Sequence, residues 1–252
     1  MTTWVLLRGL MRESRHWGEF PAQFHAAMPA QDIVTIDFPG NGQLHAETSL
    51  NRVADMAQHC RAQLMQSGHT PPYRVLALSL GAMVAVAWAE RYPDELEKLV
   101  LINTSVAPHN PFYQRLRPAN YPALFRCLLQ GSMAQREALI LRITSNLTGA
   151  SGAEEILQKW RRYASEFPIT RMNILRQLFA AMRFRAPDAA PAVPILLLAG
   201  LQDKLVNSAC SITLAKKWSC SIKTHPAAGH DLPLDDGAWV AQAIKEWLCN
   251  SQ

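Results

Sequence analysis

The stretch Val75-Leu76-Ala77-Leu78-Ser79-Leu80-Gly81-Ala82 decides the fold, because an apolar run typical of a strand passes directly into a run typical of a helix. A strand that turns sharply into a helix projects the side chain at the turn outward. The small residues Ala77 and Gly81 leave room for the strained backbone that such a turn needs. Ser79 is therefore a candidate nucleophile, and helix N-terminal amides point at whatever it attacks.

Short apolar runs recur along the chain with helical segments between them, which predicts an α/β fold with a mostly parallel, doubly wound sheet. The predicted strands lie at 4–7, 33–36, 73–78, 99–102, 195–199 and 221–224, and predicted helices lie at 50–67, 81–91 and 237–248. The chain has 252 residues and no repeat at solenoid periods. One compact unit with an insertion is therefore expected.

The alternation of strands and helices stops at 108–190, where amphipathic helical patterns appear without a convincing strand. We predict that 1–107 and 191–252 form the core and that 108–190 form a helical cap inserted into it. This segment has a net charge of +7, against +5 for the whole chain. Two apolar stripes within it are interpreted as packing surfaces: Ile156, Leu157, Trp160, Tyr163, Ala164 and Phe167, and then Met172, Leu175, Leu178, Phe179 and Met182.

An unassisted serine hydroxyl is a weak nucleophile, so Ser79 needs a general base and a group that orients that base. Asp203 follows the predicted strand at 195–199, and His230 follows the one at 221–224. Each begins a loop at the carboxyl end of a strand, where open α/β sheets bind ligands. The order Ser, Asp, His is also that of the α/β-hydrolase triad. We therefore predict Ser79, Asp203 and His230 as the catalytic residues.

Other residues compete for these roles. Asp231, Asp235 and Asp236 are rival acids, but they lie too near His230 in the sequence to come from a separate strand. His225 is the rival base, but it ends its strand instead of occupying the loop that follows. A turn serine without catalytic function is the alternative for Ser79.

Acyl transfer forms a tetrahedral oxyanion, and each preorganised donor aimed at it contributes about 10²- to 10³-fold in rate. The predicted donors are the backbone amides of Leu80, directly after Ser79, and of Leu10, in the loop after the first strand. Gly9 lets this backbone approach closely. Arg8 and Gly9 are candidate substrate-binding residues, although Arg8 either holds a substrate carboxylate or carbonyl or pairs with a nearby Asp or Glu.

Four blocks of sequence carry a resemblance that runs nearly end to end. They are Arg8-Gly9-Leu10 with Trp17, Asp37-Phe38-Pro39-Gly40-Asn41-Gly42, the turn at Ser79, and the paired tail blocks Gly200-Leu201-Gln202-Asp203 and Gly229-His230-Asp231. Through them the chain resembles the α/β-hydrolase superfamily, and within it serine carboxylesterases and thioesterases with a helical cap. It departs from the usual pattern at Ala77, where glycine is common, and at Arg8, where histidine is common.

The resemblance implies hydrolysis of a carboxylic ester or thioester through an acyl-enzyme, without a cofactor. Carbon–carbon bond hydrolases with the same triad remain an alternative, as do non-catalytic ligand-binding proteins on this scaffold. A serine at position 79, where dehalogenases and epoxide hydrolases have an aspartate, disfavours those members. The basic cap makes the layout similar to esterases that act on acyl groups held by acyl carrier protein, and it also suits a coenzyme A ester.

Composition excludes several other classes of protein. The longest apolar run, 82–89, is far too short to span a membrane, and the N-terminal segment lacks secretory features, so a cytoplasmic protein is expected. The five cysteines form no Cys-x-x-Cys pair and the eight histidines show no metal-binding spacing, so no metal is expected. Nucleic acid is not an expected partner, because no binding module or interleaved aromatic pattern accompanies the charge.

Overall fold

The computed structural model describes residues 2–29 and 31–250, and within them one six-stranded sheet lies at the centre. Its strands are β1 (Thr3–Leu7), β2 (Asp32–Ile36), β3 (Tyr73–Leu78), β4 (Leu96–Ile102), β5 (Ile195–Gly200) and β6 (Ser221–His225). They are ordered β2-β1-β3-β4-β5-β6, and every neighbouring pair is parallel. The predicted α/β class and all six predicted strands are confirmed.

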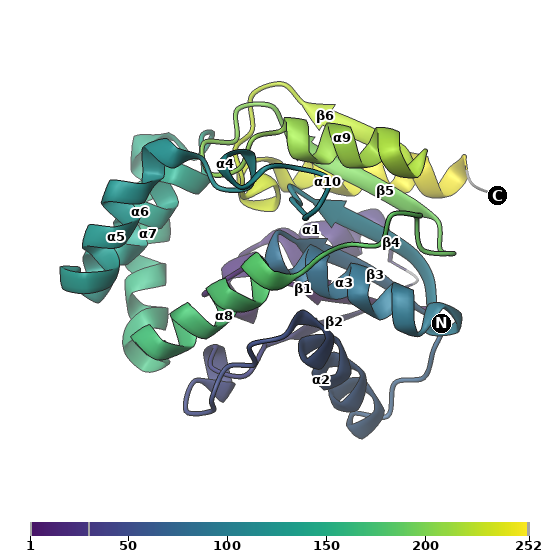
Figure 1. Cartoon of the computed structure of the whole chain (residues 1–252), viewed down its shortest axis with the longest axis horizontal. Helices are drawn as coiled ribbons and strands as arrows, with labels where there is room; N and C mark the ends of the chain where they lie inside the picture. The colour runs from purple at the N-terminus through teal and green to yellow at the C-terminus, as the bar shows by residue number, and fades with distance from the viewer. Residues whose placement is uncertain (1, 30, 251–252) are drawn as a thin grey trace.

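Helices cover both faces of this sheet (Figure 1). On one face lie α2 (Val53–Gln66), α3 (Leu80–Arg91) and α9 (Ala209–Trp218), and on the other lie α1 (Phe20–Ala27) and α10 (Leu232–Cys249). Alternate strand residues point to opposite faces, so Val5 and Leu7 pack toward the first set and Trp4 and Leu6 toward the second. Because both faces are covered, the strands read as continuous apolar runs.

The segment between β4 and β5 consists of α4 (Phe112–Arg115), α5 (Tyr121–Gln130), α6 (Met133–Thr144), α7 (Gly149–Glu166) and α8 (Arg171–Arg183). In Figure 1, α5, α6 and α7 stand together at one side of the sheet, and α8 returns from them toward it. We call these five helices the inserted helices. A single bridge between Ala107 and Arg185 joins the two ends of this segment.

One packing interpretation is wrong. In α8 the residues Met172, Phe179 and Met182 are 60, 55 and 60% exposed, whereas Asn173 and Gln177 are 5 and 0% exposed. The physical reason is hydrogen bonding. Asn173 Nδ2 donates to Glu47 O at 2.9 Å, and the Gln177 side chain bonds the Met11 amide, Asn41 Oδ1 and Ser49 Oγ. The buried side of this helix therefore combines Asn173 and Gln177 with Ile174 and Ala180, while Met172, Phe179 and Met182 face solvent.

Within residues 2–29 and 31–250, no helix has both the length and the apolar character that crossing a membrane requires. The same residues contain no group of three or more His, Cys, Asp or Glu side chains arranged to hold a metal ion.

Candidate active site

Ser79 occupies the turn between β3 and α3 with φ +55° and ψ −111°, and its side chain is half-buried. Non-glycine residues adopt positive φ only at a cost, and such strain gathers at functional sites. Gly81 makes the turn feasible, since a Cβ there would lie 2.5 Å from Leu7 O and 2.7 Å from Arg8 O. Any side chain at Gly81 would push α3 away from the end of β1.

Neighbouring strands bring other backbone against Ser79. Its amide donates a hydrogen bond to Ile102 O, at the end of β4, at 3.0 Å. On the other side, a Cβ at Gly9 would lie 3.3 Å from Ser79 Cβ and 3.8 Å from Ser79 Oγ. The loop after β1 therefore lies directly against the Ser79 side chain.

The structure brings Asp203 and His230 together at the carboxyl ends of β5 and β6. Nδ1 of His230 lies 2.6 Å from Asp203 Oδ2, and both side chains are buried. The other oxygen, Asp203 Oδ1, accepts the amides of Leu205 at 2.8 Å and Val206 at 2.9 Å. A neutral imidazole that donates from Nδ1 keeps Nε2 unprotonated, and Nε2 is then free to accept a proton.

The rival acids are engaged elsewhere. Asp231 pairs with Arg8, and Asp235 accepts the amide of Gly229 at 2.6 Å and the hydroxyl of Ser145 at 2.6 Å. Asp236 Oδ1 accepts the amide of Trp239 at 2.9 Å, near the kink inside α10. The described bonds of these three carboxylates therefore stabilise local structure, and none of them is to the His230 ring.

The rival base is also engaged. His225 Nδ1 accepts the backbone amide of Ala228 at 2.9 Å, and its Nε2 lies 3.3 Å from Asp236 Oδ2. Both ring nitrogens of His225 therefore have partners, whereas the described contacts of His230 involve only Nδ1 of its ring.

The predicted oxyanion loop is a tight turn in which the Arg12 amide donates to Gly9 O at 3.2 Å and Met11 has φ +64°. The Met11 amide donates to Gln177 Oε1 of α8 at 2.9 Å. Since this amide has a partner, the neighbouring amide of Leu10 is the candidate donor from this loop. Leu80 begins α3, so its amide is among those that an α-helix leaves without an internal acceptor.

Gln177 was not singled out from the sequence. Besides accepting from Met11, its Nε2 donates to Asn41 Oδ1 at 2.8 Å and Ser49 Oγ at 3.0 Å. Asn41 in turn donates from Nδ2 to Arg12 O at 3.0 Å, so the network returns to the same turn. A polar residue within an apolar helical pattern was the only sequence signal available.

Arg8 forms a buried ion pair with Asp231 and is only 2% exposed. Of the two roles considered for Arg8, the structure shows pairing with a nearby acid. Its guanidinium also lies over the Trp17 ring, 4.8 Å from the centroid. Because Asp231 follows His230, this pair joins the start of the predicted oxyanion loop to the loop that carries His230.

A second buried cluster joins the loop after β1 to the inserted helices. Arg12 Nη1 lies 2.5 Å from Glu137 Oε2 of α6 and 2.9 Å from His16 Nε2, and its guanidinium lies over the Trp160 ring of α7 at 4.3 Å. Burial, followed by the positive charges of Arg12 and Arg8, lowers the pKa of His16 well below its usual range. His16 is therefore neutral in the folded protein at neutral pH.

Comparison with known proteins identifies the family. A model described as "Alpha/beta hydrolase family" matches residues 4–243, so the chain belongs to the α/β hydrolase family. An abhydrolase domain-containing protein of Schizosaccharomyces pombe is 30% identical over 126 residues, which are 50% of this chain and 43% of that protein. The chain thus spans less than half the length of this curated relative.

Solved structures share the fold at lower identity. A thermophilic esterase from Thermogutta terrifontis has a TM-score of 0.78 and 21% identity, covering 99% of this chain and 90% of that chain. The 2-hydroxy-6-oxo-6-phenylhexa-2,4-dienoate hydrolase of a Rhodococcus species has a TM-score of 0.78 and 18% identity, covering 97% and 89%. Proteins of this fold therefore include hydrolases of different bond types.

Proposed function

We propose that this chain is a serine hydrolase that cleaves a carboxylic ester or thioester. The observation that carries the proposal is the 2.6 Å contact between His230 Nδ1 and Asp203 Oδ2. This contact and the strained turn residue Ser79 lie at the same edge of the sheet, at the carboxyl ends of the strands. A serine nucleophile, a histidine base and an acid that orients it are the groups that nucleophilic acyl transfer requires, which supports the proposal.

In the first half-reaction, Ser79 Oγ attacks the substrate carbonyl carbon while His230 Nε2 removes the hydroxyl proton. The carbonyl π electrons move onto oxygen, and the amides of Leu10 and Leu80 stabilise the resulting oxyanion. Asp203 remains ionised and stabilises the imidazolium. Collapse of the intermediate breaks the bond to the alcohol or thiol, and the leaving group takes the proton from His230.

In the second half-reaction, water attacks the acyl-enzyme and gives its proton to His230. The second tetrahedral intermediate collapses, Ser79 recovers its proton, and the carboxylic acid leaves. No oxidant, reductant or cofactor enters this sequence.

The inserted helices serve as the cap in this proposal, and their net positive charge favours an anionic or carrier-linked acyl substrate. On α7, Arg161 and Arg162 have exposed side chains, each 3.7 Å from a glutamate. Such exposed pairs are weak, so both arginines remain available to an anionic partner. In this account the Arg161→Gln/Arg162→Gln variant loses kcat/KM on acyl carrier protein esters and coenzyme A esters but not on neutral esters. Equal losses on all three substrates would contradict the charge-based role.

Carbon–carbon bond hydrolysis is the second candidate, because the Rhodococcus hydrolase named above shares the fold along 97% of this chain. The same triad serves both reactions, so the substrates must distinguish them. A panel of nitrophenyl esters of increasing acyl length, acyl-coenzyme A thioesters and a vinylogous diketone, compared by kcat/KM, makes this test.

Variants provide the controls for this panel. Ser79→Ala and His230→Gln should each lower kcat by at least about 10³-fold, since triad members act as a unit. The matched variant His225→Gln should retain kcat in the folded protein. Ester turnover that survives Ser79→Ala would refute the proposed mechanism, and turnover of the diketone alone would favour the second candidate.

A further inference from the structure

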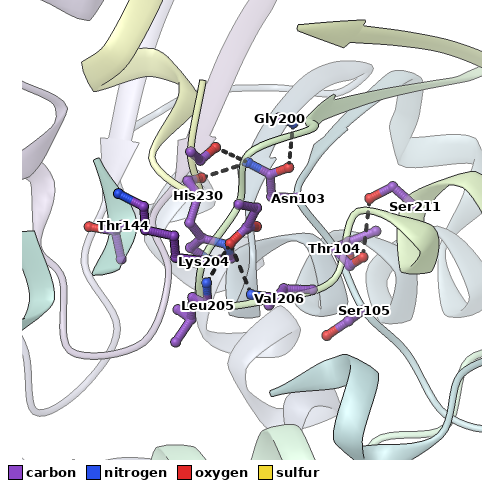
Figure 2. Close-up of polar contacts among 12 residues, drawn as sticks. Asn103, Thr104, Ser105, Thr144, Gly200, Lys204, Leu205, Val206, Ser211 and His230 are labelled. Atoms are coloured by element: carbon purple, nitrogen blue, oxygen red, sulfur yellow. Dashed lines mark hydrogen bonds and ion pairs between the residues drawn. The ribbon is translucent and has the colours of Figure 1, made fainter. Parts of the chain in front are cut away.

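Asn103 connects the loops that carry Asp203 and His230. It directly follows β4, is 2% exposed and has φ +45°. Its Nδ2 donates to His230 O at 2.7 Å and Gly229 O at 3.0 Å, and its Oδ1 accepts the amide of Gly200 at 2.9 Å (Figure 2). Both amide hydrogens and one acceptor position are therefore used.

These three bonds join two segments that must stay in register. Gly200 lies three residues before Asp203, and the carbonyls of Gly229 and His230 belong to the histidine loop. The two segments touch, because a Cβ at Gly200 would lie 2.3 Å from Gly229 O. Asn103 thus bonds the backbone of His230 itself and the backbone of Gly200, at the start of the loop that carries Asp203.

Asn103 is also coupled to the nucleophile. The residue before it, Ile102, accepts the Ser79 amide at 3.0 Å, and the Asn103 amide donates to Leu198 O of β5 at 2.9 Å. The backbone at 102–103 therefore adjoins the nucleophile turn, while the Asn103 side chain holds the base. A displacement of about 1 Å in such an arrangement can lower a rate by about 10²-fold.

We propose that Asn103 is a positioning residue that fixes the His230 loop relative to Ser79 and Asp203. The proposal rests on the proposed function. Asn103 acts through its neighbours, because its amide bonds the backbone of the two loops. An amide is specifically required, since two of its partners are carbonyl oxygens and the third is an N–H group.

The residue types that test this role are limited by the backbone. Positive φ is tolerated by Asn, Asp and Gly, so Asn103→Ala would add strain unrelated to the amide. Asn103→Asp keeps the shape and the acceptor for Gly200 but places an oxygen opposite two carbonyls. Asn103→Gly removes the side chain and keeps the backbone free to adopt φ +45°.

Ser211→Ala is the matched control. Ser211 is 1% exposed, and its hydroxyl donates to Thr104 O at 3.2 Å, one residue beyond Asn103. This variant loses a buried hydrogen bond beside Asn103 without touching the loops of Asp203 and His230 (Figure 2). It therefore measures how kcat and the NMR signal respond when a buried hydrogen bond outside the two loops is lost.

The experiment measures kcat and KM on a nitrophenyl ester, together with the low-field NMR signal of the His230 Nδ1 proton. We expect Asn103→Asp and Asn103→Gly to lower kcat by about 10- to 100-fold with KM little changed, and to shift or broaden this signal. Ser211→Ala should change neither. Asn103 variants that fold and retain both the wild-type kcat and the wild-type signal would overturn the proposal.

The NMR signal separates this proposal from the proposed function. If the wild-type protein hydrolyses no ester, the proposed function fails, while a signal lost in Asn103→Asp and kept in Ser211→Ala still supports positioning of His230. If either Asn103 variant fails to fold, the other decides the result by the same signal.

Discussion

The Arg8 guanidinium and the Asp231 carboxylate form a buried ion pair through two contacts, Nη1 to Oδ1 at 3.1 Å and Nη2 to Oδ2 at 2.5 Å. The two residues are far apart in the sequence, but each lies beside a predicted catalytic element. Arg8 precedes Gly9 of the predicted oxyanion loop, and Asp231 follows His230. The pair therefore joins the loop after β1 to the loop after β6.

Breaking this pair should destabilise the fold strongly. Arg8→Met or Asp231→Leu alone leaves one buried charge without its partner, which costs about 3–5 kcal/mol in free energy of unfolding. The double variant should recover most of this loss. Urea unfolding of all four proteins makes the measurement, and Glu97→Leu, which removes the half-exposed partner of Arg74, should cost less than about 1 kcal/mol. Single variants as stable as the wild type would contradict the prediction.

Gly81 should tolerate no side chain. Gly81→Ala places a Cβ 2.5 Å from Leu7 O, so α3 or the end of β1 must shift, and overpacking of this kind costs about 1–3 kcal/mol. The next nearest atom is Arg8 O, which belongs to the residue before Gly9. The same shift should therefore displace the predicted oxyanion loop and lower kcat. Gly152→Ala in α7 is the control, because nothing lies within 4 Å of its Cβ and the helix should gain up to about 1 kcal/mol. Equal stability of the two variants would contradict this steric account.

His16 should make the protein less stable in mild acid. The pKa of His16 is well below 6.5 in the folded state because of burial and the nearby arginines, so below pH 6.5 the unfolded chain binds a proton that the folded chain does not. The free energy of unfolding should therefore fall with decreasing pH from about 6.5, with this site contributing at most about 1.4 kcal/mol per pH unit.

Chemical denaturation between pH 7.5 and 5 checks this dependence. His16→Gln should remove the His16 part of the slope, whereas His25→Gln, at an exposed position of α1, should leave the slope unchanged. Parallel curves for wild type and His16→Gln would show that His16 does not titrate in this way.

Substitutions on the buried and the exposed face of α8 should differ in their effect on stability. Gln177→Leu leaves the Met11 amide without its acceptor and should cost about 1–3 kcal/mol in free energy of unfolding. It should also lower kcat, because Met11 lies in the predicted oxyanion loop. Phe179→Ser changes an exposed residue and should alter stability by less than about 0.5 kcal/mol. Thermal unfolding and ester kinetics on both variants are the measurements. A larger loss for Phe179→Ser would mean that the helix packs by its apolar face.

The sheet and the loops at its edge could be predicted from the sequence for a definite reason. Strands covered on both faces read as apolar runs, and residues placed just after these runs, such as Asp203 and His230, must meet at one edge of a parallel sheet. Their hydrogen bond joins the two loops that follow the neighbouring strands β5 and β6.

The residues that hold this edge together could not be predicted. Asn103 and Gln177 act through bonds to backbone more than 100 residues away in sequence, at 229–230 and at Met11, and no local pattern records such contacts. The predicted orientation of α8 is wrong for the same reason. Its apolar stripe predicts a buried face, but the hydrogen bonds of Asn173 and Gln177 to distant residues decide which face is buried.

The central claim is that Ser79 is an activated nucleophile, and a fluorophosphonate probe tests it most directly. The native protein, incubated with the probe and digested, should carry one adduct on the peptide that contains Ser79, as located by mass spectrometry. Ser79→Ala should carry none, and His230→Gln should label at least about 10³-fold more slowly. A folded native protein that stays unlabelled at Ser79, or labels equally at another serine, would contradict the account.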